Sequence, residues 1–177
     1  MILLKITDIK LLMQKLLSEN ETAFDSFLLS EAVIRMSSTY VFDGHINKDF
    51  YSSEELEELE TAAQSKGRIF SDQMVRWSQT KLQAFSIIKG KKTPSTFSFV
   101  FYLAKENINK FTLGLSGEVS PESIAGLMLK INYDGSTLTI STGSALNIFS
   151  LDKTVDKAWD EMVKKFISSL EINYEEL

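Results

Sequence analysis

Apolar side chains recur at three- and four-residue intervals near both ends of the chain. At the N-terminal end this spacing predicts an amphipathic helix that begins after Thr7 or Asp8, with a short strand over Ile2 to Ile6 before it. After Asp152 the same spacing predicts a long helix whose apolar face packs on a sheet. The apolar positions are Ile9, Leu12, Met13, Leu16 and Leu17 in the first helix and Val155, Trp159, Met162, Val163, Phe166, Ile167 and Leu170 in the last.

In other segments the pattern has a period of two, which is typical of strands with one buried face. Residues 27–46 alternate in this way and contain the turn signal Asp43-Gly44, so we expect two or three antiparallel strands there. Leu127 to Ile140 alternate on both sides of Asp134-Gly135, which predicts a hairpin with a type I′ turn. A further strand is expected over Ala145 to Leu151.

An acidic helix is expected between the first strands and the middle of the chain. Ser52-Ser-Glu-Glu55 fits a capping box, and the early glutamates suit the positive end of a helix dipole. Leu56, Leu59 and Ala63 form only a thin apolar stripe, which ends near Gly67. This pattern predicts a helix that lies on the surface.

Residues 74–88 allow two interpretations, a loose helical face or, over 82–88, a strand. The turn-like sequence Lys89-Gly-Lys-Lys-Thr-Pro94 follows, and then 95–103 are rich in aromatic and β-branched residues. We therefore favour the strand, which makes the segment a hairpin with a basic tip. A short helix is expected over 105–111.

These elements predict a single α+β domain over residues 1–177, with a mainly antiparallel sheet, amphipathic helices at both ends and one acidic surface helix. The order of elements suggests a duplication. A strand, a helix and paired strands occupy 2–46, and a strand, a short helix and three strands occupy 95–151. No sequence identity supports the repeat, so it is a pattern of elements only.

The composition excludes several classes of protein. Of 177 residues, 44% are hydrophobic and 24% charged, as in an ordinary globular domain. Cysteine is absent and histidine occurs once, so disulfide frameworks, Cys or His zinc sites, thiol nucleophiles and Ser-His-Asp triads are impossible or poorly supplied. The glycines fit neither a dinucleotide-binding nor a P-loop spacing. We expect no cofactor, no metal site and no assigned catalytic residue.

Acidic and basic residues are segregated along the chain. The net charge is −5, but residues 66–92 contain seven basic residues and one acidic residue, a net charge of +6. The remaining residues therefore carry −11, and five glutamates lie just upstream, between 54 and 60. Such segregation predicts either a binding surface for an anionic partner or a solvated face that balances the acidic helix.

The basic segment is the candidate binding site. Arg76-Trp77 places a cation beside an aromatic ring, and three lysines cluster at one turn, a combination suited to phosphate contact and base stacking. We predict a non-enzymatic binding protein that uses this basic hairpin against a nucleic acid or an acidic protein surface, with no membrane partner. The candidate residues are Arg68, Arg76, Trp77, Lys81, Lys89, Lys91 and Lys92.

Three alternatives are open. The duplicated pattern looks like one domain of a sliding-clamp processivity factor, which would have to assemble around DNA. An enzyme acting on a small ligand would use Asp43, His45 and Asp49 as its least poor acid–base candidates. A structural subunit would meet a partner chain through a sheet edge or exposed aromatic residues. The oligomeric state does not follow from the sequence.

Charged residues interrupt the apolar N-terminal segment and no run of about 18 apolar residues occurs, so we expect a cytoplasmic protein. Seven segments spread over nearly the whole chain carry a resemblance to a known family: Lys5 to Lys10, Asn47 to Ser53, Arg76 to Gln79, Ile88 to Pro94, Phe97 to Phe101, Leu151 to Lys153 and Ala158 to Lys165. In these segments the chain resembles an uncharacterised protein family of clostridial-type Firmicutes. The resemblance implies a bacterial single-domain protein and transfers no catalytic residue.

Overall fold

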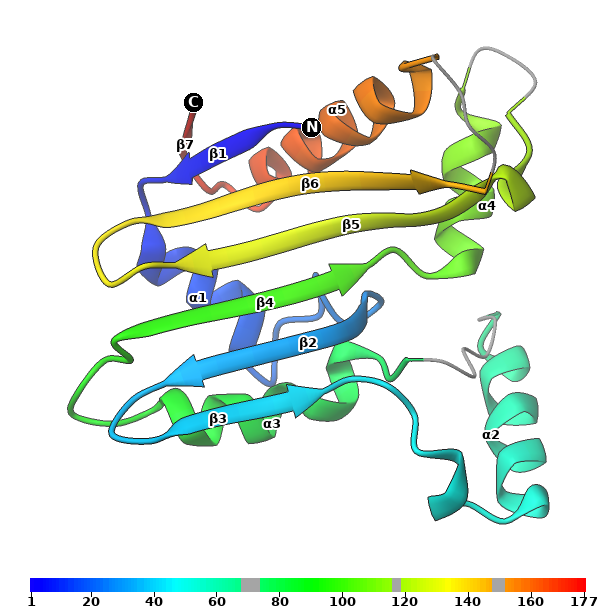
Figure 1. The fold of residues 1–177 in the computed structure, drawn as a ribbon, viewed down its shortest axis with the longest axis horizontal. Coiled ribbons are helices and arrows are strands. Elements are labelled where there is room, and N and C mark those ends of the chain that lie inside the picture. The colour runs from blue at the N-terminus through cyan, green and yellow to red at the C-terminus, as the bar shows by residue number, and fades with distance from the viewer. Residues whose placement is uncertain (68–73, 116–118, 148–151) are drawn as a thin grey trace.

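The computed structural model describes residues 1–67, 74–115, 119–147 and 152–177. These residues form seven strands and five α-helices (Figure 1). The strands are β1 (Leu3–Ile6), β2 (Leu28–Arg35), β3 (Thr39–Asp43), β4 (Thr96–Tyr102), β5 (Ile124–Tyr133), β6 (Leu138–Leu146) and β7 (Tyr174–Glu176). The helices are α1 (Ile9–Leu17), α2 (Ser53–Ser65), α3 (Trp77–Ile88), α4 (Lys105–Leu113) and α5 (Thr154–Ser169), with short 3₁₀ turns at Lys48–Phe50 and Pro121–Ser123.

The strands form one sheet in the order β3-β2-β4-β5-β6-β1-β7, and every pairing in it is antiparallel. The predicted single α+β domain with a mainly antiparallel sheet is therefore confirmed. The centre of the sheet is formed by β4, β5 and β6, and β4 pairs with both of its neighbours, β2 and β5, over most of its length. The C-terminal strand β7, which the sequence pattern did not indicate, pairs with β1 at one edge.

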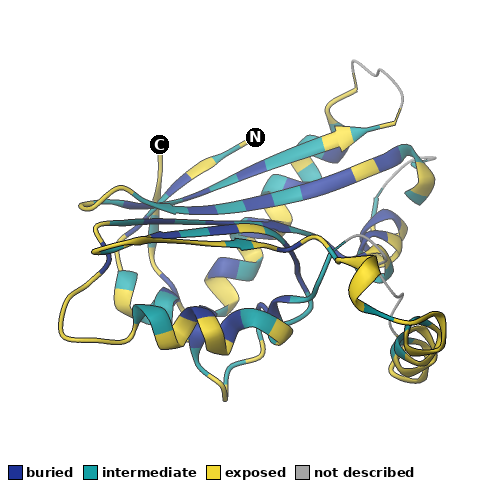
Figure 2. Ribbon diagram, turned by 60° about the horizontal axis from the view of Figure 1, so that its bottom comes forward, coloured by how far each residue is buried: buried dark blue, intermediate teal, exposed yellow. Residues whose placement is uncertain are grey.

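One face of the sheet carries the core. Phe97, Phe99 and Phe101 of β4 are buried on this face, whereas the residues between them are only partly buried. Trp77 of α3 packs edge-on against Phe99 and Phe101, and α5 contacts β6 on the same face. Figure 2 shows the helices gathered on one side of the strands. The period-two burial follows from the pleat, which sends alternate side chains to opposite faces.

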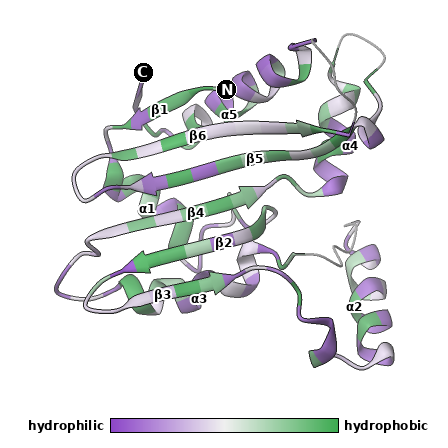
Figure 3. Ribbon diagram, viewed as in Figure 1, coloured by the Kyte–Doolittle hydropathy of each residue, from purple (hydrophilic) through white to green (hydrophobic). Residues whose placement is uncertain are grey.

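The acidic helix α2 stands at one corner of the molecule and has no buried residue (Figure 1). Its capping box forms as predicted, since the Ser52 hydroxyl accepts from the Glu55 backbone and the Glu55 carboxylate accepts from the Ser52 backbone. Figure 3 shows mixed hydropathy along α2 and mainly hydrophobic colour on β2 and β3. The prediction of an acidic surface helix is confirmed.

The hairpin over Leu127 to Ile140 is present as β5 and β6, but the type I′ turn is wrong. A type I′ turn needs a positive φ at both central residues, and of Asp134 and Gly135 only Gly135 has one. Four residues separate the paired ends Tyr133 and Leu138. The Asp134 carboxylate closes this longer loop by accepting the backbone N–H groups of residues 136 and 137.

Three other predictions need correction. Residues 77–88 form helix α3, so the strand over 82–88 and the basic hairpin are wrong. The turn between β2 and β3 lies at 36–38, and Asp43-Gly44 instead marks the end of β3. No separate strand begins at Ala145, because β6 runs unbroken to Leu146, and residues 148–151 lie outside the described residues.

The suggested duplication is reflected in the order of elements, since β1-α1-β2-β3 is followed by β4-α4-β5-β6. The pairings differ between the two halves. Strand β4 lies directly beside β5, but β1 lies beside β6 and is separated from β2 by three strands. The relation to a sliding-clamp domain remains a prediction.

Among the residues that the structure describes, no helix combines the length and apolar character needed to cross a bilayer.

Candidate functional site

The middle of the basic segment packs against the core, because helix α3 buries Trp77 and Lys81. Trp77, at its first position, is fully buried, and its indole N–H donates to the backbone carbonyl of Leu16 at 2.7 Å. Because both ring faces are covered, Trp77 offers no surface for base stacking. It joins α3 to α1 and to the aromatic core.

Two basic side chains of the segment are held by acidic partners from distant parts of the chain. The Lys81 side chain is 5% exposed, and its ammonium donates to Asp25 Oδ1 at 2.7 Å and to the Glu21 carbonyl at 2.6 Å. The Arg76 guanidinium donates to Glu106 Oε1 at 2.7 Å and to the carbonyl of Ser26 at 3.1 Å. These contacts fix the loop between α1 and β2 and leave neither cation oriented toward solvent.

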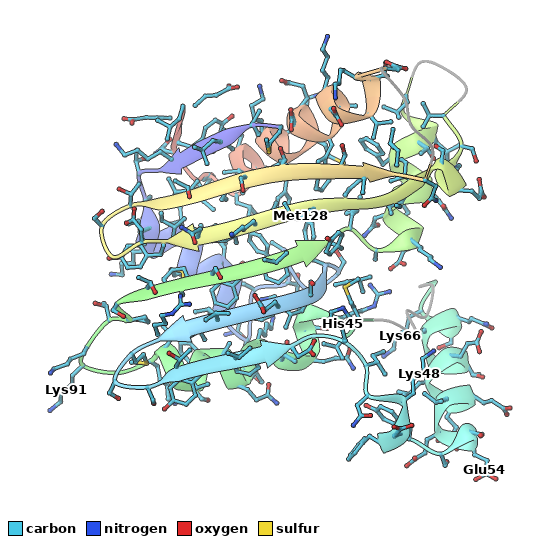
Figure 4. The ribbon with its side chains drawn as sticks, viewed as in Figure 1. His45, Lys48, Glu54, Lys66, Lys91 and Met128 are labelled. Carbon is cyan, nitrogen blue, oxygen red and sulfur yellow. The ribbon has the colours of Figure 1, made fainter. Side chains whose placement is uncertain are left out.

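The last part of the basic segment is a cationic surface at the end of α3. Lys89, Lys91 and Lys92, which we call the basic turn, are exposed on the connection from α3 to β4. No ion pair engages any of the three among the described residues. Lys91 points away from the protein at one end of the sheet in Figure 4. The Lys89 ammonium lies 5.7 Å from the centre of the Phe85 ring, which is 40% exposed.

A fourth cation adjoins the basic turn and comes from another strand. Arg35 ends β2, and its carbonyl accepts from the Ser95 backbone and hydroxyl at the point where the turn enters β4. Its exposed guanidinium donates to the Thr96 hydroxyl at 3.5 Å. Sequence reasoning missed Arg35 because it lies outside the basic segment, and only the β2–β4 register brings it there.

The remaining predicted binding residue, Arg68, lies outside the described residues. Lys66, which starts the basic segment, follows α2 at the opposite end of the molecule from Lys91 (Figure 4). The acidic helix is likewise distant from the basic turn, since Glu54 and Lys91 lie at opposite ends of Figure 4. The segment is therefore divided into a distant part, a buried part and one exposed cationic turn.

The acid–base alternative is an exposed surface pair. His45 Nδ1 lies 2.5 Å from Asp43 Oδ1, and their side chains are 61% and 75% exposed. The backbone N–H of His45 and then its imidazole lower the pKa of Asp43. Asp49 belongs to the following 3₁₀ turn, where its backbone N–H donates to Asn47. The Asp43–His45 pair is therefore a contact between two solvent-exposed side chains at the end of β3.

Hydroxyl and carboxylate groups also meet where α5 crosses β6, beside a recess of about 620 Å³. Asp156 accepts from the hydroxyl of Ser144 and pairs with Lys153 at 3.0 Å, and Asp160 accepts from the fully buried Thr142. The Ser144 hydroxyl is the main cause of a lowered pKa at Asp156, followed among the favourable contacts by Lys153. These bonds tie the last helix to the sheet.

The described residues hold no group of three or more His, Asp or Glu side chains placed to bind a metal ion. The molecule is thus an α+β domain with helices on one face of an antiparallel sheet and one exposed basic turn. The chain belongs to a family of unknown function, DUF5721, which matches residues 15–175. No curated protein and no solved structure matches the sequence.

Proposed function

We propose that the protein is a non-enzymatic binding protein whose basic turn contacts the phosphates of a nucleic acid. The observation that carries the proposal is the contrast within one segment. Arg76 and Lys81 are paired with carboxylates that are at most 19% exposed. Lys89, Lys91 and Lys92 are exposed and have no ion-pair partner among the residues that the structure describes. Exposed unpaired cations on one turn, next to a partly exposed aromatic ring, suit phosphate contact.

The charges around the turn support an anionic partner. Arg35 adds a fourth cation from β2. The β5–β6 loop brings Asp134 to the same end of the sheet, but its carboxylate already accepts from Ser136 and Thr137. Among the described residues, Asp134 forms no ion pair with any lysine of the basic turn.

The test is a titration of fluorescently labelled single- and double-stranded oligonucleotides followed by anisotropy. Intrinsic fluorescence is a poor probe because Trp77 and Trp159 are buried. If the three lysines of the turn each neutralise one phosphate, raising salt from about 50 to about 200 mM should weaken double-strand binding about forty-fold and single-strand binding about twenty-fold. Replacing Lys89, Lys91 and Lys92 by Glu should abolish binding.

A second triple variant controls for net charge. Lys110, Lys157 and Lys165 are exposed on α4 and α5, so replacing them by Glu makes the same charge change away from the turn. The control should retain most of the affinity. If both triples lose binding equally, the basic turn is not the site. If the wild type binds no oligonucleotide at low salt but binds poly-glutamate, the partner is an acidic protein surface instead.

The bacterial Firmicutes origin and the cytoplasmic location stay predictions of the sequence. Both are compatible with a nucleic-acid ligand.

A further inference from the structure

The sheet has a second face, opposite the one that α3 and α5 contact. Its side chains come from the partly exposed positions that alternate with the core residues of β2, β4 and β5. The apolar residues of this face lie on four strands, where Val33 pairs with Val41 and Tyr102 pairs with Met128, and we call them the open face. They are Val33, Val41, Val100, Tyr102 and Met128.

Two glycines keep part of the open face flat. A β-carbon at Gly126 would lie 2.9 Å from the Tyr102 ring, and one at Gly143 would lie 3.0 Å from the Met128 methyl group. Each larger side chain therefore covers the backbone of the neighbouring strand. The close approach that a glycine allows inside a strand is, at both positions, that of a side chain from the neighbouring strand of the same sheet.

Two opposite charges flank the centre of this face, an acidic residue on one side and a basic residue on the other. The strand register pairs Val100 of β4 with Glu31 on one side and with Lys130 on the other. At the usual strand spacing, Glu31 and Lys130 are about 10 Å apart, too far for a direct ion pair. Neither of them forms an ion pair within the described part of the chain.

We propose that the open face binds a second copy of this chain to form a two-fold symmetric dimer. In such an interface each residue meets the position related to it by the symmetry axis. An axis along β4, above Val100, places Glu31 of one copy opposite Lys130 of the other, and the same pair recurs on the far side. The two unpaired charges thereby satisfy each other twice.

The charge pattern also selects the direction of the axis. An axis across the strands at Val100 would place Glu31 over Glu31 and Lys130 over Lys130, and like charges at an interface oppose association. An axis along the strands keeps the two sheets aligned, which is a preferred arrangement for face-to-face packing.

The size of the face suits a dimer of this kind. The five strands from β3 to β6 span about 24 Å, and eight residues of strand span about 27 Å. The flat footprint is then about 650 Å² per copy, close to the roughly 800 Å² that each partner buries in a standard interface. The basic turn lies at the end of the strands, outside this face, so dimerisation and nucleic-acid binding can fail independently.

The experiment is sedimentation equilibrium of the full chain and of two charge-reversed variants, Glu31→Lys and Lys130→Glu. Wild type should form dimers, and each variant should weaken them at least about tenfold because it creates two like-charge contacts. An equimolar mixture of the two variants should restore the dimer. In the mixed dimer the lysine introduced in one variant faces the glutamate introduced in the other, and the native Lys130 of the first faces the native Glu31 of the second.

Controls with the same charge changes elsewhere are Glu58→Lys on α2 and Lys10→Glu on α1, both exposed, and these should dimerise like wild type. A wild type that stays monomeric overturns the proposal. So does a dimer that neither reversal weakens, since it must use another surface. A mixture that fails to reassociate refutes the pairing of Glu31 with Lys130.

Discussion

Loss of the Lys81 ammonium should destabilise the fold without changing the affinity of the basic turn for oligonucleotides. The Lys81→Met variant keeps the length of the aliphatic chain but leaves the carboxylate of Asp25, 19% exposed, and the Glu21 carbonyl without their donor. Breaking a buried ion pair from one side costs about 3 to 5 kcal/mol. Since Asp25 is partly solvated, we expect the lower value, about 3 kcal/mol, and a fall in Tm of about 8 °C for a chain of this length.

Urea unfolding followed by circular dichroism measures this change. Lys91→Met removes an exposed ammonium and serves as the matched control, with an expected change within about 0.5 kcal/mol. Adding Asp25→Leu to Lys81→Met should recover most of the loss, because the unpaired carboxylate is then absent. Below the unfolding transition, Lys81→Met should bind oligonucleotides as wild type does. A loss of stability under 1 kcal/mol, or an oligonucleotide affinity that falls as in the Lys89, Lys91 and Lys92 triple, would refute the structural role.

Two further predictions concern the sheet and its last helix. Gly44→Ala should lower the free energy of unfolding, measured in urea, by at least about 2 kcal/mol, because the added β-carbon would lie 1.9 Å from the Leu29 carbonyl oxygen. Gly90→Ala is the control and should be nearly neutral, because no atom lies within 4 Å of its added β-carbon. Equal effects would contradict the clash. The lowered pKa of Asp156, caused first by Ser144, means that its stabilisation is present above the unfolded-state pKa of 3.8 and is lost as pH falls through the folded-state pKa. In Asp156→Asn the free energy of unfolding should therefore fall less steeply than in wild type as the pH drops below about 5. The same pH dependence in both proteins would count against the contact between Asp156 and Ser144.

The error at α3 has a physical cause. Its buried positions, Trp77, Lys81 and Ala84, have the spacing of a helix face, but one of them is a lysine. A pattern that counts lysine as polar loses the helical period at that point. The outward positions Leu82 and Phe85 are large and apolar, about 40% exposed, and they favour the competing strand. Tertiary partners that are distant in sequence therefore decide this helix.

By contrast, the elements whose buried face is wholly apolar were predictable. Helix α5 buries Val155, Trp159 and Val163 at helical spacing, and β5 alternates as expected. The site was only partly predictable, because a count of charges cannot distinguish a paired cation from a free one. Asp25 and Glu106, which pair with two of the candidates, lie 56 and 30 residues away along the chain.

The segment between β3 and α3, which contains α2, begins and ends at adjacent positions beside the sheet. His45 and Met74 form an antiparallel bridge, and Val75 links the two sides by donating to the Gly44 carbonyl while its own carbonyl accepts from Leu29. The segment between His45 and Met74 therefore begins and ends at neighbouring positions. A two-residue turn could replace it without moving β3 or α3, and the shorter loop would lower the entropy cost of closure by about 2 kcal/mol. The same geometry makes this position a natural point for grafting a foreign domain.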